Sequence, residues 1–121
     1  MNIEKLNLAL SDLQTAMRGG LISSSIWGSD GLDLQKFNDT PVTAAMFEQF
    51  YQFFDNALNT VGWPSLEPYY MMQLEDNTWA VLLVSDTLRW SLIVDRDKVT
   101  LGMLMSVILP KAVADLNAIA A

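Results

Sequence analysis

The sequence predicts a single α/β domain, residues 1–121, in which a β-sheet lies between helices. Helical and strand patterns follow the order α-β-β-α-β-β-β-α over 121 residues, a length that suits one domain. The segment 80–84 (AVLLV) is apolar at every position, and the segment 88–94 carries apolar side chains on both faces. Strands of this kind are covered on both faces, so we expect helices on each side of the sheet.

The composition is apolar and acidic, with 51% hydrophobic residues, 17% charged residues and a formal net charge of −7. Because this is more apolar and less charged than a typical soluble domain, we expect a subunit interface to bury the excess. The absence of cysteine excludes disulfides and thiolate metal sites, and the absence of histidine removes the commonest general base. The negative charge argues against nucleic acid and anionic membranes as partners, since both require clustered lysine and arginine.

Two features of the sequence favour a cytoplasmic location. The N-terminal segment MNIEKLNLAL lacks the basic region, apolar stretch and cleavage site of a secretory signal. The longest apolar stretch, 101–109, is interrupted by Ser106 and is too short to span a bilayer. We therefore expect no membrane insertion.

Residues 2–18 are expected to form an amphipathic helix. Asn2 can cap its first turn, and Gly19-Gly20 ends it. Steps of three and four residues form one apolar face, made of Ile3, Leu6, Leu10, Leu13 and Met17.

A hairpin is expected next, with strands at 21–27 and 32–37 joined by the turn 28–31 (GSDG). These turn residues tolerate the positive φ angles that tight hairpin turns require. The run Ser23-Ser24-Ser25 makes the first of these strands unusually polar.

The second helix is expected to have Thr40 as its cap and Pro41 at its first position, and to run to about Val61. Gly62, followed by Pro64, ends it. At about 100° per residue its apolar side chains cover an arc of roughly 160°, whereas one contact with a sheet needs about 100°. We therefore expect this helix to pack against both the sheet and a second subunit.

Three strands are expected at 69–75, 78–84 and 88–94, with Asp76-Asn77 as the turn between the first two. A last helix is expected from about 100 to 118, kinked at Pro110 because proline lacks the backbone donor. Its buried face is predicted to contain Leu101, Leu104, Met105, Ile108, Ala112 and Ile119.

With this order of elements, the sequence resembles the Roadblock family, which includes the dynein Roadblock light chains and bacterial polarity regulators that act on Ras-like GTPases. The resemblance covers nearly the whole chain and is carried by the turn 28–32 (GSDGL), the strand cluster 69–95 and Gly102. It implies a Roadblock/profilin-like fold, with a five-stranded antiparallel sheet, the second helix on one face and the two terminal helices on the other. The serine-rich first strand and Pro110 depart from the family pattern.

The resemblance also implies a homodimer in which the central helices lie side by side and the third strands pair edge to edge. The predicted dimer interface contains Met46, Phe47, Phe50, Tyr51, Phe54, Leu58, Tyr69 and Met71. In the family, the paired central helices form a platform for the partner. The polar stripe of this helix is therefore predicted to point away from the sheet and to bind the partner; it consists of Glu48, Gln52, Asp55 and Asn59.

Other features favour structural roles. The turn 28–31 lacks the lysine and the following helix of a phosphate-binding loop, and the serine run has no histidine to activate a nucleophile. Arg18, Arg89 and Arg96 are placed in ordinary surface contexts, so none stands out as a catalytic finger. No cation-binding spacing relates Asp30, Asp33, Asp95 and Asp97. Core and interface packing is the expected role of Tyr69, Tyr70, Trp79 and Trp90. We predict no enzyme activity, no cofactor and no metal.

The leading hypothesis is a non-catalytic dimeric module that regulates or scaffolds a small Ras-like GTPase or a GTPase-linked complex. The alternative is a small acidic secretion chaperone, which would hold an unfolded substrate segment in apolar grooves. A genomic neighbour that encodes a Ras-like GTPase would favour the first hypothesis, and a neighbouring secreted effector would favour the second.

Overall fold

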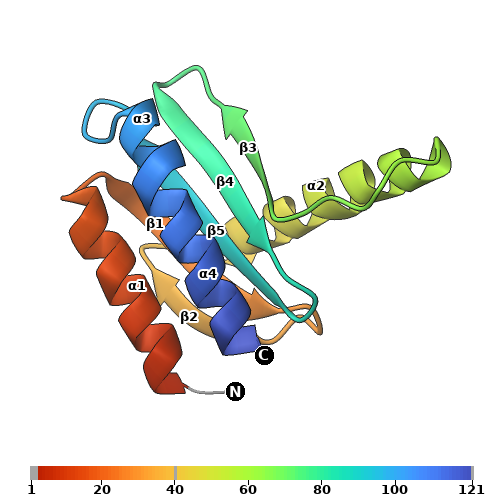
Figure 1. Ribbon diagram of the computed structural model, residues 1–121, viewed down its shortest axis with the longest axis horizontal. Helices are drawn as coiled ribbons and strands as arrows, with labels where there is room; N and C mark the ends of the chain where they lie inside the picture. Colours follow the sequence, from red (N-terminus) through yellow and green to blue (C-terminus); the bar gives the residue numbers. More distant parts are fainter. Residues whose placement is uncertain (1–2, 40, 121) are drawn as a thin grey trace.

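The computed structural model describes residues 3–39 and 41–120, and its elements follow the predicted order (Figure 1). The helices are α1 (Ile3–Met17), α2 (Pro41–Thr60), α3 (Leu101–Met103), the π-helical turn η1 (Leu104–Ile108) and α4 (Leu109–Ala120). The strands are β1 (Leu21–Gly28), β2 (Asp33–Phe37), β3 (Tyr69–Gln73), β4 (Thr78–Val84) and β5 (Leu88–Asp95). The predicted caps Asn2 and Thr40 lie outside the described residues.

The five strands form one antiparallel sheet in the order β2-β1-β5-β4-β3. The helices α1 and α4 cover one face of this sheet, and α2 crosses the other face (Figure 1). α2 connects β2 at one edge to β3 at the opposite edge, and β4 and β5 then fold back toward the centre. The predicted α/β sandwich is confirmed.

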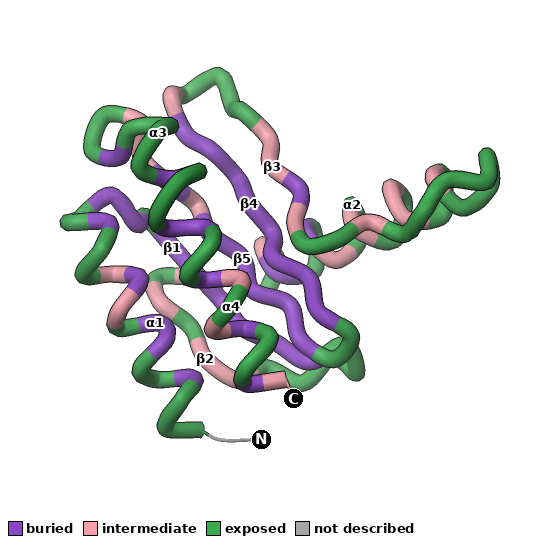
Figure 2. The backbone as a smooth tube through the Cα atoms, in the orientation of Figure 1, coloured by how far each residue is buried: buried purple, intermediate pink, exposed green. Residues whose placement is uncertain are grey.

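The two faces of the sheet carry separate hydrophobic cores. The larger core lies between the sheet and the helices α1, η1 and α4, and it includes Trp79, Val81, Trp90 and Leu92. The smaller core lies beneath α2 and is built from Trp27, Ala44, Phe47, Tyr70, Ala80, Leu82 and Val84. Because β4 contributes to both cores, it is buried along its whole length (Figure 2).

α1 packs through its predicted apolar face, with one exception. Ile3 is exposed, because the first turn of the helix extends beyond the sheet (Figure 1). The glycine stop is confirmed: Gly19 has a φ of 84°, and the Gly20 N–H donates to the Met17 carbonyl at 2.9 Å. The buried positions of the helix are Leu6, Ala9, Leu10, Leu13 and Met17.

The predicted turn joins β1 and β2. Gly31 has a φ of 91°, a conformation that costs glycine little, and the Gly28 N–H donates to the Leu32 carbonyl at 2.8 Å. The Asp30 carboxylate accepts a hydrogen bond from the Leu32 N–H at 3.0 Å. These contacts account for the turn without any bound group.

The serines of β1 are buried, because β1 is an interior strand of the sheet, and the side chains of Ser24 and Ser25 form hydrogen bonds. Ser24 Oγ donates to the Ser91 carbonyl at 2.7 Å and accepts from Trp90 Nε1 at 2.8 Å. A buried indole N–H needs such an acceptor. The polar run is therefore structural, and Ser24 gives Trp90, which is fully buried in the larger core, a fixed position.

α2 ends at its predicted glycine. Gly62 has a φ of 82°, and its N–H donates to the Asn59 carbonyl at 3.1 Å, while the Trp63 N–H donates to the Leu58 carbonyl at 2.9 Å. This pair of hydrogen bonds is the Schellman motif, which satisfies carbonyl groups at the end of a helix.

The predicted kink at Pro110 takes the form of a π-helical turn. The Leu109 N–H donates to the Leu104 carbonyl, so η1 accommodates one extra residue immediately before the proline. The extra residue rotates the beginning of the helix relative to α4. Leu101 and Met105, which were predicted to be buried, are consequently 52% and 41% exposed.

The continuous helix Leu101–Ala120 is long and apolar enough to cross a membrane by length and composition alone. This finding contradicts the expectation that no segment is long enough. A single such helix is weak evidence, because core helices of soluble proteins pass the same test. Here Leu104, Leu109 and Leu116 are buried in the larger core, so the helix is part of the folded domain.

Candidate protein-interaction surface on α2

α2 is longer than the part of the sheet that it covers. Its 20 residues extend about 30 Å at about 1.5 Å per residue. Its buried residues, Ala44 and Phe47, both lie in its first half. The second half extends past β3 into solvent (Figures 1 and 2). Residues 50–66, which comprise this second half and the loop that returns along it, are named the projecting arm.

The projecting arm exposes large apolar side chains. Phe53 is 70% exposed, Val61 69% and Trp63 66%, and Asp55 is the only charged residue of the arm. Large apolar side chains that gather on one projecting segment favour contact with another protein. The arm is therefore the strongest candidate for an interface in the described part of the chain.

Aromatic contacts hold the arm in place. The Phe54 ring packs edge-on against the Tyr70 ring of β3, with centroids 5.4 Å apart, and Phe50 stacks on Phe54 at 6.1 Å. The Tyr70 hydroxyl donates to the Phe47 carbonyl at 2.9 Å. Burial raises the pKa of Tyr70 well above its ordinary value, and Glu48 adds to the rise. Tyr70 thus joins β3 to α2 in its neutral form.

A buried arginine fixes the first half of α2 to the sheet. Arg89 on β5 is 6% exposed; its Nη1 donates to the Ser85 carbonyl at 2.6 Å and its Nε donates to Glu48 Oε2 at 3.3 Å. Its guanidinium also lies over the Tyr51 ring, 4.4 Å from the centroid. Burial raises the pKa of Tyr51, and the nearby Arg89 charge partly opposes this rise.

Arg89 corrects an expectation, because the sequence placed it on an ordinary surface. The alternation of side chains along β5 indicates its true position. Leu88 and Trp90 point into the larger core, so Arg89 between them must point to the face that α2 covers.

The polar stripe of α2 does not point away from the sheet as a whole. Glu48 faces the sheet, where it contacts Arg89, and Asp55 accepts a hydrogen bond from the Leu66 N–H at 2.9 Å. Gln52 and Asn59 are exposed. The predicted orientation is therefore wrong for Glu48, which contacts Arg89 on the sheet, and it stays a prediction for Gln52, Asp55 and Asn59.

Some residues of the predicted dimer interface are buried within the monomer, and others are exposed. Phe47 is fully buried inside the monomer, so the prediction that it faces a partner is wrong: it occupies the centre of the apolar arc, where the helix meets the sheet. Tyr69 and Met71 belong to the edge strand β3, but their side chains pack on the face that α1 and α4 cover. Exposed or half-buried positions on α2 remain at Met46, Phe50, Tyr51, Phe54 and Leu58.

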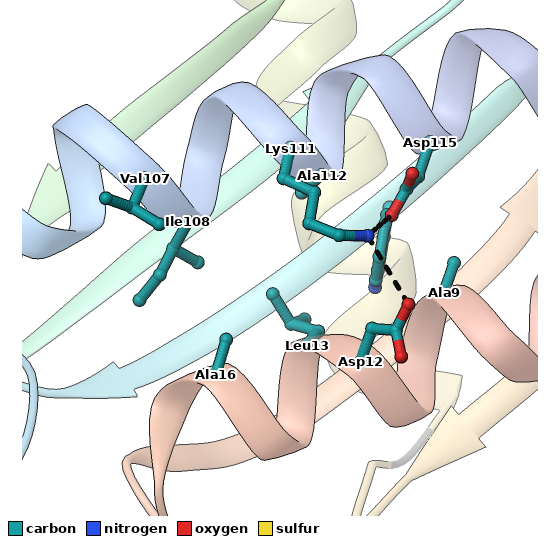
Figure 3. A pocket seen from close by; sticks show the side chains of 10 residues that line it. Ala9, Asp12, Leu13, Ala16, Val107, Ile108, Lys111, Ala112 and Asp115 are labelled. Carbon is teal, nitrogen blue, oxygen red and sulfur yellow. Dashed lines mark hydrogen bonds and ion pairs between the residues drawn. The ribbon is translucent and has the colours of Figure 1, made fainter.

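A small cavity between α1 and α4 is shown in Figure 3. Its volume is about 30 Å³, with Leu13, Trp90 and Ile108 in its lining. This space is far below the roughly 300 Å³ of a small-molecule site. At its edge the Lys111 side chain forms ion pairs with two carboxylates: Lys111 Nζ lies 2.7 Å from Asp115 Oδ2 and 3.4 Å from Asp12 Oδ2. We interpret the cavity as a packing gap between two helices.

Within residues 3–39 and 41–120, no group of three or more acidic, histidine or cysteine residues is arranged to hold a metal ion. The Asp95 carboxylate accepts from the Asp97 N–H at 2.9 Å, and Asp97 accepts from Asn77 Nδ2 at 2.5 Å. These aspartates therefore stabilise turns, which is the structural role expected from the sequence.

Comparison with known proteins gives structural neighbours but no sequence relatives. No family model matches the chain, and no curated protein matches it. The solved structure of Myxococcus xanthus MglB superposes with a TM-score of 0.82, at 14% identity, over 98% of this chain and 89% of that one. A structure described as MglB with tetrameric arrangement gives 0.74 at 13% identity, over 96% of this chain and 90% of that one.

A Roadblock/LC7 domain from Streptomyces avermitilis is also similar. It has a TM-score of 0.70 at 11% identity, over 88% of this chain and 92% of that domain. Both kinds of neighbour are matched over nearly their full length. The resemblance drawn from the sequence is therefore confirmed at the level of structure, and this chain has the Roadblock fold of MglB and the Roadblock/LC7 domain.

Proposed function

We propose that this chain is a non-catalytic, cytoplasmic homodimeric module that regulates or scaffolds a small Ras-like GTPase. The observation that carries the proposal is the projecting arm on a Roadblock fold. The fold is that of MglB, and the sequence resembles a family whose bacterial polarity regulators act on Ras-like GTPases. This likeness favours a folded GTPase over the unfolded segment that a secretion chaperone would hold.

The proposed dimer brings the projecting arms of two copies together. Burial of Phe50, Phe53 and Trp63 against a second copy would remove the apolar surface that a soluble monomer rarely exposes. A specific interface buries at least about 1,000 Å², and an arm carried by each copy can supply such an area. The tetrameric arrangement described for one MglB structure supports self-association of this fold.

The proposed partner surface lies on the outward side of the paired helices. Gln52 and Asn59 are its candidate contacts, since both are exposed on α2. Asp55 contributes negative charge from a position fixed by the Leu66 N–H, whereas the Glu48 charge is paired with Arg89 on the sheet. In a chain of net charge −7, such a surface favours a basic patch on the partner and speeds association.

The test is titration of the purified chain with a small Ras-like GTPase from the same organism, loaded with either GDP or a non-hydrolysable GTP analogue. We expect Gln52→Lys combined with Asn59→Lys to leave the dimer intact and to weaken binding about tenfold, which corresponds to about 1.4 kcal/mol. Asn117→Lys on α4 is the matched control, because it adds a lysine at an exposed asparagine on the opposite face. Binding to neither nucleotide form would contradict the proposed partner, and equal loss in the control would contradict the proposed surface.

A further inference from the structure

An open surface groove lies on the face of the sheet opposite α2. Its volume is about 520 Å³, and it is lined by Met71, Gln73, Trp79, Arg96 and Leu101. β4 forms its floor, between β3 on one side and α3 on the other (Figure 1). The groove is formed within one copy of the chain, and it borders the β3 edge where a second copy is expected, because Met71 and Gln73 belong to that strand.

The lining of the groove is mixed: Met71, Trp79 and Leu101 are apolar, whereas Gln73 and Arg96 are polar. Leu101 is exposed because η1 rotates the beginning of the last helix away from the core. Met103 and Met105 are also exposed on α3 and η1, whereas Val107 lies beside the cavity between α1 and α4. Flexible methionine side chains can adapt to different partner side chains, which makes them common at binding surfaces.

The groove contains one charged side chain, Arg96. Its guanidinium lies over the Trp79 ring, 5.3 Å from the centroid. Among the described residues Arg96 forms no ion pair. The neighbouring Asp95 carboxylate accepts a hydrogen bond from the Asp97 N–H, and Asp97 accepts one from Asn77 Nδ2 in the turn between β3 and β4. The fork of N–H donors on a guanidinium matches a carboxylate, so Arg96 offers an unused site for one.

We propose that this groove binds a segment of a partner protein that carries a bulky apolar side chain next to a carboxylate. The carboxylate pairs with Arg96, and the apolar side chain lies on Met71, Trp79 and Leu101. The positive charge in the groove is complementary to an acidic segment, although the chain as a whole is strongly acidic.

Two other occupants fit less well. In a two-fold contact between copies, each groove would face its own equivalent, which would bring two Arg96 side chains close together. An anionic membrane would be repelled by the net charge of −7. Both alternatives are outcomes that the experiment below detects.

The test uses a phage library of random dodecapeptides, selected on the wild-type dimer and in parallel on Arg96→Glu. We expect wild-type selection to enrich peptides with aspartate or glutamate beside a large apolar residue, and Arg96→Glu to enrich lysine or arginine at that place. In fluorescence titrations, the enriched wild-type peptide should lose affinity about tenfold or more with Arg96→Glu, as loss of a charge-assisted hydrogen bond predicts.

Two further variants keep the result interpretable. Leu101→Glu should also weaken the peptide, and it alters an exposed side chain that the fold does not need. Lys98→Glu is the matched control, because it reverses an exposed charge two positions from Arg96 and outside the groove lining. Peptides that are insensitive to Arg96→Glu and Leu101→Glu would overturn the proposal. A lower solution mass of Leu101→Glu, or binding of wild type to phosphatidylserine vesicles that Leu101→Glu abolishes, would overturn it in favour of a second copy or a membrane.

Discussion

Phe53→Asp should separate the proposed dimer into folded monomers. Phe53 is 70% exposed in the single chain, so an aspartate there changes monomer stability by no more than about 0.5 kcal/mol. Full burial of a phenylalanine contributes about 1.5–3 kcal/mol, so burial of the exposed part in both copies contributes about 2–4 kcal/mol. At about 1.4 kcal/mol per factor of ten, loss of this contact raises the dissociation constant roughly 30- to 1,000-fold. Two unpaired carboxylates in the interface add to the loss.

The assay is size-exclusion chromatography with light scattering over a range of micromolar concentrations. Wild type should have a mass of twice 13.5 kDa, and Phe53→Asp should have the mass of one chain. Leu8→Asp is the matched control, because Leu8 is also a largely exposed apolar residue but lies on α1, across the sheet from α2. Its mass should equal that of wild type. Phe54 is a poorer choice for this test, since its ring packs on Tyr70 within the monomer.

Two results would refute the reasoning. A wild-type chain that remains monomeric at tens of micromolar would show that the projecting arm does not drive self-association. A Phe53→Asp variant that remains as tightly dimeric as wild type would show that the copies meet through another surface. Urea denaturation of both variants checks that the monomer fold is intact.

Three further predictions concern the monomer. Arg89→Ala should lower the free energy of unfolding by about 2–3 kcal/mol in urea titrations, because two backbone carbonyls and Glu48 lose their donor. Ser24→Ala should lower it by about 1–3 kcal/mol, because the buried Trp90 N–H loses its acceptor; an unchanged midpoint would contradict this. Tyr70 has a raised pKa in the folded state. Its contribution to the free energy of unfolding is therefore fully present below the unfolded pKa of about 10 and is lost as the pH rises further. The stability of wild type should therefore fall above about pH 10, and Tyr70→Phe should fall less steeply when unfolding is measured across that range.

Features that depend on residues close together along the chain were predictable from the sequence. Gly31 and Gly62 occupy positive-φ positions that few other residues tolerate; Gly31 lies in the predicted hairpin turn, and Gly62 follows the end of α2 as expected. Period-two alternation assigned Trp90 and Leu92 to one face of β5 and Ile93 to the other. Because these signals are local, they fixed the order of elements and the sandwich architecture.

The candidate site was harder to predict because it depends on where α2 meets the sheet. Periodicity identifies an apolar arc but not which part of the arc faces the sheet, so Phe47 and Phe50 could not be told apart. The structure buries Phe47 fully and leaves Phe50 exposed. Similarly, Pro110 predicts a defect in the helix but not the extra residue in η1, which exposes Leu101 and Met105.

The two edges of the sheet differ in charge, and the difference favours β3 over β2 as the edge that a second copy contacts. β2 presents charged residues, with Lys36 Nζ paired to Asp33 Oδ2 at 3.1 Å, and charge is a common protection against pairing with another strand. β3 has the sequence YYMMQ, without any charge, and among the described residues no strand pairs with its outer edge. The projecting arm extends past this same edge (Figure 1). A second copy that continued the sheet at β3 would pair the open edge and cover the arm in one contact, whereas a copy placed at β2 would leave both exposed.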